Sequence, residues 1–458
     1  MAVTATRLLD NYIDGEWTPA RAATEVLDVT RPATGEVLAR VPLSGASDLD
    51  DAVRAARDAL PEWRAVSTIA RARKLFELRE RLVARSEEMA RSVTTEMGKT
   101  IADARAEVAR MVEMVEAACA VPTTMQGRVL EDVSRNIDAE TIRQPVGVCA
   151  AIVPFNFPAM VPFWFLPFAI ACGNTFVLKP SEQVPLTQQI AFEELHALGL
   201  PPGVVNLVNG GREVVEGILD HPGIDAVSFV GSAPVARIVY ERAAKAGKRV
   251  QALGGAKNHM VVMPDAVIDK TVEGIIGSAF GAAGQRCMAG SVVVTVGDAH
   301  EQLMGPLVSA TRELRVGDGL DEDSDVGPVI SCAARDRIRD WIGRGEASGA
   351  KVVLDGRSAS GDPNGAYVGP TILDGVTPEM DIAQEEVFGP VLSVISAPTL
   401  DEAIGIVNGS RFGNGTSIFT ESGASVRRYR HEVQAGMVGV NIGVAAPVAF
   451  FPFTGWKD

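Results

Sequence analysis

From residue 149 onward, short apolar runs alternate with longer segments of helical character. Strands that are buried on both faces and joined by crossover helices give this alternation, and they form a mostly parallel sheet. The same alternation continues after Gly254, which predicts a second domain of the same kind. The sequence therefore predicts an α/β protein with two parallel α/β domains. The expected strands cover 149–153, 175–178, 204–208, 226–230, 249–252 and 260–263.

The first third of the chain shows helical periodicity instead. Leu75, Leu78 and Leu82 lie at positions i, i+3 and i+7, and apolar residues recur with the same spacing over 108–115. Such spacing places apolar side chains on one face of a helix. We expect two amphipathic helices here, with a break at 98–100, and a helical first third overall.

The longest apolar stretch, 159–172, contains Pro162 and Pro167 and is shorter than the ~20 residues that a membrane-spanning helix requires. We interpret it as a buried helix. Residues 1–9 lack the apolar core of a secretory signal. Both observations predict a soluble protein.

Composition limits the classes of protein that remain. A chain of 458 residues with 47% hydrophobic and 22% charged residues can bury a large core, and its length favours two or three domains. A formal charge of −15 argues against nucleic acid or an anionic membrane as partner. The five scattered cysteines form no CxxC pair, so neither a disulfide framework nor a metal site is expected. They suit a reducing cytoplasm.

Cys287 stands out among these cysteines. It is flanked by small residues within 284–290 and precedes the apolar run 292–294, which places it at the mouth of a buried strand. Arg286 would favour the nucleophilic thiolate if its charge points inward. A small cysteine that merely fills the core remains the alternative.

Six motifs occur along the chain in a fixed order, and the segment around Cys287 is one of them. Together they resemble the aldehyde dehydrogenase superfamily along almost the whole chain. Within that superfamily, the sequences of 255–259 and 284–289 resemble the corresponding motifs of the branch that uses coenzyme A to oxidise methylmalonate semialdehyde. The motifs lie at 154–158, 179–182, 228–232, 253–259, 284–290 and 385–390.

The resemblance implies a domain organisation. Residues 1–121 and 146–253 would form a Rossmann-like NAD-binding domain, and 254–458 the catalytic domain. Residues 122–145 would form a β oligomerisation arm, through which relatives assemble as homotetramers. Relatives continue for a few dozen residues beyond Asp458 and supply the last strand of the arm, so we expect an incomplete arm in this chain.

The cofactor site has no G-x-G-x-x-G fingerprint. Gly231 and Ser232 instead form a strand–turn–helix junction, where a backbone can approach a pyrophosphate. Many such turns hold no ligand. By resemblance, Lys179 and Glu182 bind the adenosine ribose, and a carboxylate at Glu182 favours NAD over NADP; without the other motifs they would be a surface ion pair. The remaining residues that the resemblance assigns to NAD are Phe155, Leu253, Glu386, which holds the nicotinamide ribose, and Phe388.

The resemblance also implies the chemistry. Cys287 attacks the aldehyde, and Asn156 with the backbone N–H of Cys287 stabilises the oxyanion. Hydride transfer then leaves a thioester on Cys287. Hydrolytic members carry a glutamate that activates water at the position of Leu253, and Leu253 cannot act as a base. The missing base favours coenzyme A as the acyl acceptor.

Substrate recognition is assigned by the same resemblance to Arg110 and Arg286, which match a pair that binds a substrate carboxylate. Guanidinium groups suit bidentate carboxylate recognition. Judged from the sequence alone, Arg110 lies off the apolar stripe of its helix and is equally suited to solvent.

The expected function is therefore NAD-dependent, CoA-acylating oxidation of malonate or methylmalonate semialdehyde to acetyl-CoA or propionyl-CoA, with release of CO2. Two alternatives remain: an NAD-dependent enzyme that forms a free carboxylic acid, and a catalytically silent homologue. The sequence leaves open which semialdehyde is physiological and whether the pathway is valine or inositol breakdown. The expected partners are small molecules and further copies of this chain.

Overall fold

The computed structural model describes residues 7–21, 23, 25–359 and 361–458. The chain divides into two compact units, each with its own sheet. The main boundary falls between Leu253 and Gly254, where the sequence also placed a domain boundary. Two short N-terminal segments group with the second unit, which the sequence did not predict. The first unit comprises 1–30, 37–93 and 105–253, and the second comprises 31–36, 94–104 and 254–458.

The sheet of the first unit has the strand order β11-β10-β7-β8-β9-β1-β2. The strands β10, β7, β8 and β9 pair in parallel, while β1 adds antiparallel to β9. The strands are β1 Asn11–Ile13, β2 Glu16–Thr18, β7 Val148–Ile152, β8 Thr175–Lys179, β9 Val205–Leu207, β10 Ala226–Gly231 and β11 Arg249–Gly254.

Alternate residues of the central strands face a cluster of buried apolar side chains. Val148, Ala150 and Ile152 of β7 belong to this cluster, together with side chains from α1, α9 and α10. On α2, the expected apolar positions are buried, and this helix packs on α5, α7 and α8. The helices of this part of the chain are α1 Ala46–Ala65, α2 Thr68–Ala84, α3 Ser86–Met97, α4 Ile101–Cys119, α5 Val121–Thr124, α6 Met160–Phe163, α7 Leu166–Ala171, α8 Leu186–Ala197, α9 Arg212–Asp220 and α10 Ala233–Lys245.

The predicted strands from residue 149 onward are confirmed to within two residues at each end. The two amphipathic helices and the break at 98–100 are also confirmed, because α3 ends at Met97 and α4 begins at Ile101. Gly98 supports the break with a positive φ of 97°.

Two expectations about secondary structure are wrong. The first third is not wholly helical, because strands β1 to β4 precede α1, with β3 at Glu25–Thr30 and β4 at Val37–Leu43. Of these strands, β1 joins the sheet of the first unit through the distant β9, while β3 and β4 pair only with each other in a separate two-stranded sheet. The apolar stretch 159–172 forms two short helices, α6 and α7, and Pro167 lies in the first turn of α7.

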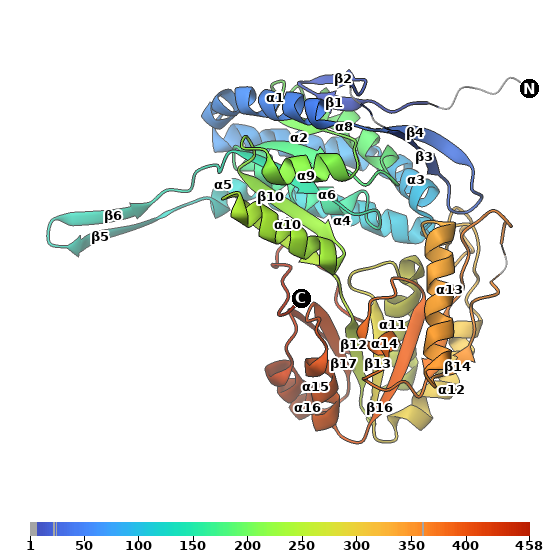
Figure 1. The fold of residues 1–458 in the computed structure, drawn as a ribbon. Helices are drawn as coiled ribbons and strands as arrows, with labels where there is room; N and C mark the ends of the chain where they lie inside the picture. The colour runs from blue at the N-terminus through green and yellow to red at the C-terminus, as the bar shows by residue number, and fades with distance from the viewer. Residues whose placement is uncertain (1–6, 22, 24, 360) are drawn as a thin grey trace, which may run out of the picture. The chain divides into compact units, whose positions relative to one another are not determined.

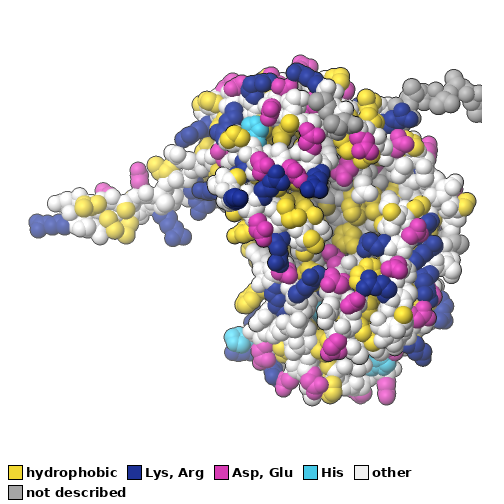
Figure 2. All heavy atoms as spheres, in the orientation of Figure 1, with side chains coloured by type: hydrophobic (Ala, Val, Ile, Leu, Met, Phe, Trp, Pro, Cys, Tyr) yellow, Lys and Arg dark blue, Asp and Glu magenta, His cyan; other side chains and the backbone are white. Residues whose placement is uncertain are grey.

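A β-hairpin projects from the first unit, as Figure 1 shows for β5 (Arg128–Ser134) and β6 (Ile137–Thr141). Every residue of both strands is exposed. Apolar and basic side chains both occur on it (Figure 2), and its exposed apolar residues include Val129, Leu130 and Ile137. The hairpin lies within the expected arm 122–145, and a role in assembly stays a prediction.

The sheet of the second unit has the order β14-β15-β16-β13-β12-β17-β18. All neighbours pair in parallel except β14 and β15. The strands are β12 Asn258–Val262, β13 Gly290–Val296, β14 Lys351–Leu354, β15 Thr371–Asp374, β16 Val391–Ala397, β17 Gly415–Phe419 and β18 Met437–Val440.

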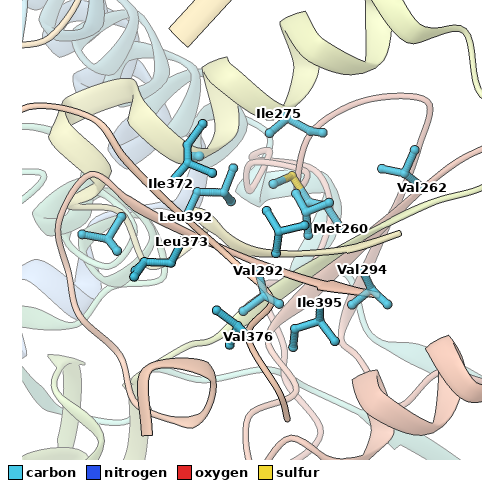
Figure 3. Close-up of a cluster of buried hydrophobic side chains, with 14 of the residues drawn as sticks. Met260, Val262, Ile275, Val292, Val294, Ile372, Leu373, Val376, Leu392 and Ile395 are labelled. Carbon is cyan, nitrogen blue, oxygen red and sulfur yellow. The ribbon is translucent and has the colours of Figure 1, made fainter. Parts of the chain in front are cut away.

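Branched and sulfur-containing side chains fill the core of this unit. Figure 3 shows Met260, Val292 and Ile395 from adjacent strands together with Ile275 of the helix above them, and all four are buried. The mostly parallel, doubly covered sheet confirms the predicted fold class in both units. The helical elements are α11 Ile268–Phe280, the 3-10 turn η1 Gly281–Gly284, α12 Ala299–Arg312, α13 Cys332–Ala347, α14 Asp381–Gln384, α15 Leu400–Gly409 and α16 Gly423–Glu432.

Among the helices that the structure describes, none is both long and apolar enough to cross a bilayer.

Leu78 of α2 tests the packing of the first unit, since it is completely buried. We expect Leu78→Ala to lower the free energy of unfolding by about 2–5 kcal/mol, because the substitution removes apolar contacts and leaves a cavity. Phe76→Ala, on the same helix but 58% exposed, is the matched control and should change it by about 1 kcal/mol or less. Urea denaturation followed by circular dichroism measures both, and equal losses would contradict the packing.

Candidate active site

In the first unit, the predicted site residues follow the parallel strands. Lys179 is the last residue of β8, Asn156 lies in the loop after β7, and Ser232 follows β10. Because β10, β7 and β8 are parallel neighbours, their carboxyl ends meet at one edge of the sheet. This edge is where open α/β sheets bind ligands. The structure therefore brings together residues that lie more than 70 positions apart in the sequence.

Lys179 and Glu182 form an ion pair at this edge, with 2.8 Å between Nζ and Oε2. Lys179 is buried, while the side chain of Glu182 is 35% exposed. Burial alone would raise the pKa of the Glu182 carboxyl, but the Lys179 ammonium outweighs it and holds that pKa below its usual range. Glu182 is thus an ionised acceptor, which suits a ribose hydroxyl and repels a phosphate.

Gly231 and Ser232 form the turn between β10 and α10. A Cβ atom at Gly231 would lie 2.5 Å from Cζ of Phe229, so the turn has no room for a side chain there. Ser232 is the N-cap of α10, its side chain makes no capping hydrogen bond, and Pro234 occupies the first turn. The first N–H groups of this helix suit an anion such as a pyrophosphate. With the Lys179–Glu182 pair, this turn fits NAD.

The loop that carries Phe155 and Asn156 is held from two helices. Glu107 of α4 accepts hydrogen bonds from the N–H groups of Ala159 and Met160 at 2.8 and 3.1 Å. Gln188 of α8 donates to the carbonyl of Pro158 at 2.6 Å. Asn156 itself is 4% exposed.

Arg110 lies on α4, one turn after Glu107. Its guanidinium pairs with Glu113 at 2.6 Å, and both side chains are about two-fifths exposed, at 40% and 38%. An exposed pair of this kind holds its partners weakly. Arg110 is therefore free to exchange Glu113 for another carboxylate.

Leu253 lies near the end of β11 and is partly buried. The residues before it, Gln251 and Ala252, supply no carboxylate either. The strand end offers no general base at the position where the resemblance places one.

In the second unit, the predicted site residues precede their strands. Cys287 comes shortly before β13, Glu386 before β16, and the segment around Lys257 before β12. Because β16, β13 and β12 are parallel neighbours, their amino ends share one edge. Cys287 therefore precedes the strand that lies between β16, which follows Glu386, and β12.

A left-handed turn leads into Cys287. Ala282 and Ala283 have φ values of 49° and 51°, and Gly284 has 68°. Left-handed conformations cost residues with a side chain about 1–2 kcal/mol each, so their neighbours must hold them. A Cβ atom at Gly284 would lie 2.1 Å from the carbonyl oxygen of Gly389, which excludes any side chain there.

Two asparagines fix the backbone at Cys287. Asn258 Nδ2 donates to the carbonyls of Cys287 and Ala289, both at 2.9 Å, and Asn414 Nδ2 donates to the Cys287 carbonyl at 3.3 Å. Asn258 also accepts from the N–H of Gly415 at 3.0 Å. The nucleophile segment is thereby tied to the amino ends of β12 and β17.

The electrostatics around Cys287 favour the neutral thiol. Burial raises the pKa of Cys287 to about 12, and the Glu386 carboxylate adds to this effect. Burial also raises the pKa of Glu386 to about 7, although the charge of Lys257 opposes it. The pKa of Lys257 falls to about 8, again because of burial. Glu386 and Lys257 therefore titrate near neutral pH, whereas Cys287 stays a neutral thiol there.

Arg286 favours the thiolate only weakly. Its Nη2 lies 2.5 Å from Oδ1 of Asp103, and its Nη1 donates to the carbonyl of Gly277 at 3.2 Å. Its charge lowers the pKa of Cys287, but it is the weakest of the influences that do so. The predicted effect of Arg286 on the thiol therefore has the expected direction, and burial outweighs it.

Phe388 adopts a positive φ of 55°, which is unusual for a residue with a large side chain. It precedes Gly389, whose carbonyl contacts the turn at Gly284. The predicted nicotinamide pocket residue thus belongs to the same backbone contact as the turn before the nucleophile.

Comparison with known proteins identifies the family of the chain. The model of the aldehyde dehydrogenase family matches residues 17–458. The chain belongs to the aldehyde dehydrogenase family. This aldehyde dehydrogenase is 51% identical over 457 residues to malonate-semialdehyde dehydrogenase 2 of Geobacillus kaustophilus, covering 99% of this chain and 94% of that protein. It is 50% identical over 451 residues to the malonate-semialdehyde dehydrogenase of Halalkalibacterium halodurans, covering 98% and 93%.

Solved structures give the same result. A protein from Sinorhizobium meliloti, described as a methylmalonate-semialdehyde dehydrogenase and complexed with NAD, superposes with a TM-score of 0.97 at 43% identity, over 99% of this chain and 93% of that one. A methylmalonate-semialdehyde dehydrogenase from Oceanimonas doudoroffii gives 0.96 at 42% identity, over the same shares. The predicted family and fold are confirmed.

Sequence reasoning missed several residues that hold the site together. Asn258 and Lys257 lie inside a recognised motif, but their contacts depend on strands that are far away in the sequence. Asp103 and Glu107 lie on a helix that was predicted from its apolar spacing, and that spacing assigns no role to its acidic residues. A signal was available, because acidic residues four positions apart share one helix face.

Glu386 provides a test of this electrostatic arrangement. Above pH 7 its carboxylate is ionised and raises the pKa of Cys287, so we expect Glu386→Gln to lower that pKa. Alkylation of Cys287 by iodoacetamide at pH 8 should then become about threefold faster or more. Peptide mapping separates Cys287 from the exposed Cys332.

The matched control is Glu385→Gln, since Glu385 is 43% exposed and pairs with Arg411 at 2.7 Å. It should leave the alkylation rate unchanged. An unaltered pH profile in Glu386→Gln would contradict the assigned influence of Glu386 on the thiol.

Proposed function

We propose that this aldehyde dehydrogenase oxidises malonate or methylmalonate semialdehyde with NAD and passes the acyl group to coenzyme A, with release of CO2. The observation that carries the proposal is the identity of about half of all residues, 51% and 50%, to malonate-semialdehyde dehydrogenases over nearly the whole chain. The NAD complex of a structural neighbour, and the fit of Lys179, Glu182 and the α10 turn, support NAD.

Cys287 is the proposed nucleophile. Its Sγ loses its proton to solvent and bonds to the aldehyde carbon, and the carbonyl oxygen becomes an oxyanion that the Asn156 amide and the Cys287 N–H stabilise. The chemistry that NAD supplies when bound is hydride acceptance, and Lys179, Glu182, Ser232, Glu386 and Phe388 are the residues that would hold it. Loss of hydride from the adduct leaves a thioester on Cys287.

The thiol of coenzyme A then replaces Cys287. A bond forms from its sulfur to the acyl carbon as the bond to Cys287 Sγ breaks, and Cys287 recovers its thiol proton from that of coenzyme A. Leu253 supports this acceptor over water, because neither it nor Gln251 and Ala252 can deprotonate a water molecule. A carboxylate β to a thioester carbonyl is then lost as CO2.

The proposal extends to assembly and location. We propose a homo-oligomer that uses the exposed β5–β6 hairpin, whose Val129 and Leu130 are 72% and 61% exposed. We also propose a cytoplasmic location, because the five cysteines are all free.

Product analysis tests the acyl acceptor. With malonate or methylmalonate semialdehyde and NAD alone, we expect a burst of NADH equal to the number of active sites, followed by slow turnover. Coenzyme A should restore steady turnover and yield a thioester, and Cys287→Ala should abolish both phases. Leu253→Glu should divert product toward the free acid by supplying a base. Free acid as the main product of the parent enzyme with coenzyme A present would refute the acyl-transfer proposal.

The two arginines should differ. Arg110 holds only an exposed partner, so Arg110→Leu should lower kcat/KM about tenfold or more for a carboxylated semialdehyde and little for propanal. Arg286 is the second proposed carboxylate contact, but it also holds Asp103, so Arg286→Leu should lower activity on both substrates. Steady-state kinetics with each substrate measure this, and a selective loss in Arg286→Leu would assign its guanidinium to the substrate alone.

A further inference from the structure

Helix α4 carries two buried or partly buried carboxylates one turn apart, and each contacts a different loop of the site. Asp103 and Glu107 are separated by four residues, so they lie on the same face of the helix. The side chain of Asp103 is 23% exposed, and Glu107 as a whole is 3% exposed.

Asp103 binds the nucleophile loop with both oxygens. Oδ2 accepts from the N–H of Ala282 at 2.9 Å, and Oδ1 binds Arg286 Nη2 at 2.5 Å. One carboxylate thus contacts the first left-handed residue of the turn and the residue next to Cys287. It supplies a charge-assisted bond at the strained alanine and neutralises the arginine.

Asp103 also has an ordinary role within its own helix. Its N–H donates to Oγ1 of Thr100 at 3.2 Å, and Thr100 Oγ1 donates back to Oδ2 at 3.3 Å. A capping residue of this kind would stabilise α4 without acting on the nucleophile. Capping involves only residues of the helix terminus, so the contacts of Asp103 with Ala282 and Arg286 are additional to it.

Glu107 binds the other loop. Its Oε1 accepts from two successive backbone N–H groups, those of Ala159 and Met160, directly after the segment that carries Asn156. These donors are buried, so without Glu107 they would lose their partner at a cost of about 1–3 kcal/mol each.

We propose that α4 positions both catalytic loops of this enzyme, through Asp103 for the loop of Cys287 and through Glu107 for the loop of Asn156. Both are positioning residues, since neither needs to touch the substrate. The proposal rests on the proposed function for the roles of Cys287 and Asn156. Asp103 acts on its loop within the second unit and Glu107 on its loop within the first, and both carboxylates belong to the same helix.

Two rate constants separate the roles of the carboxylates. The first is alkylation of Cys287 by iodoacetamide, followed by peptide mapping, which needs no substrate. The second is the NADH burst with propanal in stopped flow, which needs both loops in place. The chain of 458 residues is used throughout, and NAD binding is followed by fluorescence.

Asp103→Asn should make Cys287 more reactive but less productive. The freed charge of Arg286 and the loosened turn should raise the alkylation rate about threefold or more, while the burst should slow about tenfold or more because the thiol is misplaced. Arg286→Met breaks the same contact from its partly exposed side without freeing a charge, so it should slow the burst about tenfold without raising the alkylation rate, and it serves if Asp103→Asn does not fold.

Glu107→Ala should slow the burst about tenfold and leave alkylation of Cys287 within about twofold of the parent. Glu107→Gln should restore the burst to within about threefold, because the amide oxygen accepts the same two bonds. Neither variant should change NAD affinity.

Two controls exclude a general effect of the helix. Glu116→Gln alters an exposed carboxylate of α4 that pairs with Arg79, and it should change neither rate. Thr100→Ala removes the cap, which should cost about 1 kcal/mol of stability but spare both rates.

Opposite changes of the two rates in Asp103→Asn, with an isolated burst defect in Glu107→Ala, would support the proposal. Unchanged rates, a parallel fall of both rates in either variant, or an alkylation change in Glu107→Ala as large as in Asp103→Asn would overturn it. Failure of the semialdehyde reaction with normal behaviour of these variants would refute the proposed substrate while leaving the positioning roles intact.

Discussion

Parallel pairing of strands buried on both faces is the constraint on which both units depend. In the first unit it gathers the ends of β10, β7 and β8 at one edge, and Ser232, Asn156 and Lys179 lie there. In the second unit the candidate site residues Cys287 and Glu386 precede their strands, so they lie at the edge of the sheet that the amino ends of the strands form. Crossover helices make this possible, because they return the chain to the same edge after every strand.

The nucleophile loop shows how such an edge is refined. Cys287 follows three residues in left-handed conformation, and their cost is met by specific partners rather than by packing alone. Asn258 and Asn414 bind the carbonyl of Cys287, and Asp103 binds the start of the turn. Buried hydrogen bonds of this kind specify one arrangement, because leaving any of these groups unpaired costs free energy.

Charge burial sets the chemical state of the site before any substrate arrives. Burial raises the pKa of Cys287 and of Glu386 and lowers that of Lys257, so each group is held nearer its neutral form than it would be in water. Arg286, whose charge lowers the pKa of the thiol, is paired with Asp103, and burial outweighs its effect.

The sequence by itself determined the family, the alternating α/β architecture, the strand positions from residue 149 onward and the identity of the candidate nucleophile. These features could be predicted because residues close together in the sequence encode them, as apolar runs, helical spacing and short motifs. The resemblance also predicts that Leu253 stands where hydrolytic members carry a base, and this prediction needs only the sequence.

The tertiary structure decided what the local pattern could not express. The strand β1 joins its sheet through β9, which is distant in the sequence, and 159–172 breaks into two helices. The charge of Arg286 is directed to Asp103, 183 residues away, rather than to the adjacent Cys287. Glu107 and Asp103 acquire their roles in the same way. These roles depend on which side chains and backbone groups come into contact after folding. The free energy of a buried charge or hydrogen bond is determined by these contacts, and not by the neighbouring residues in the sequence.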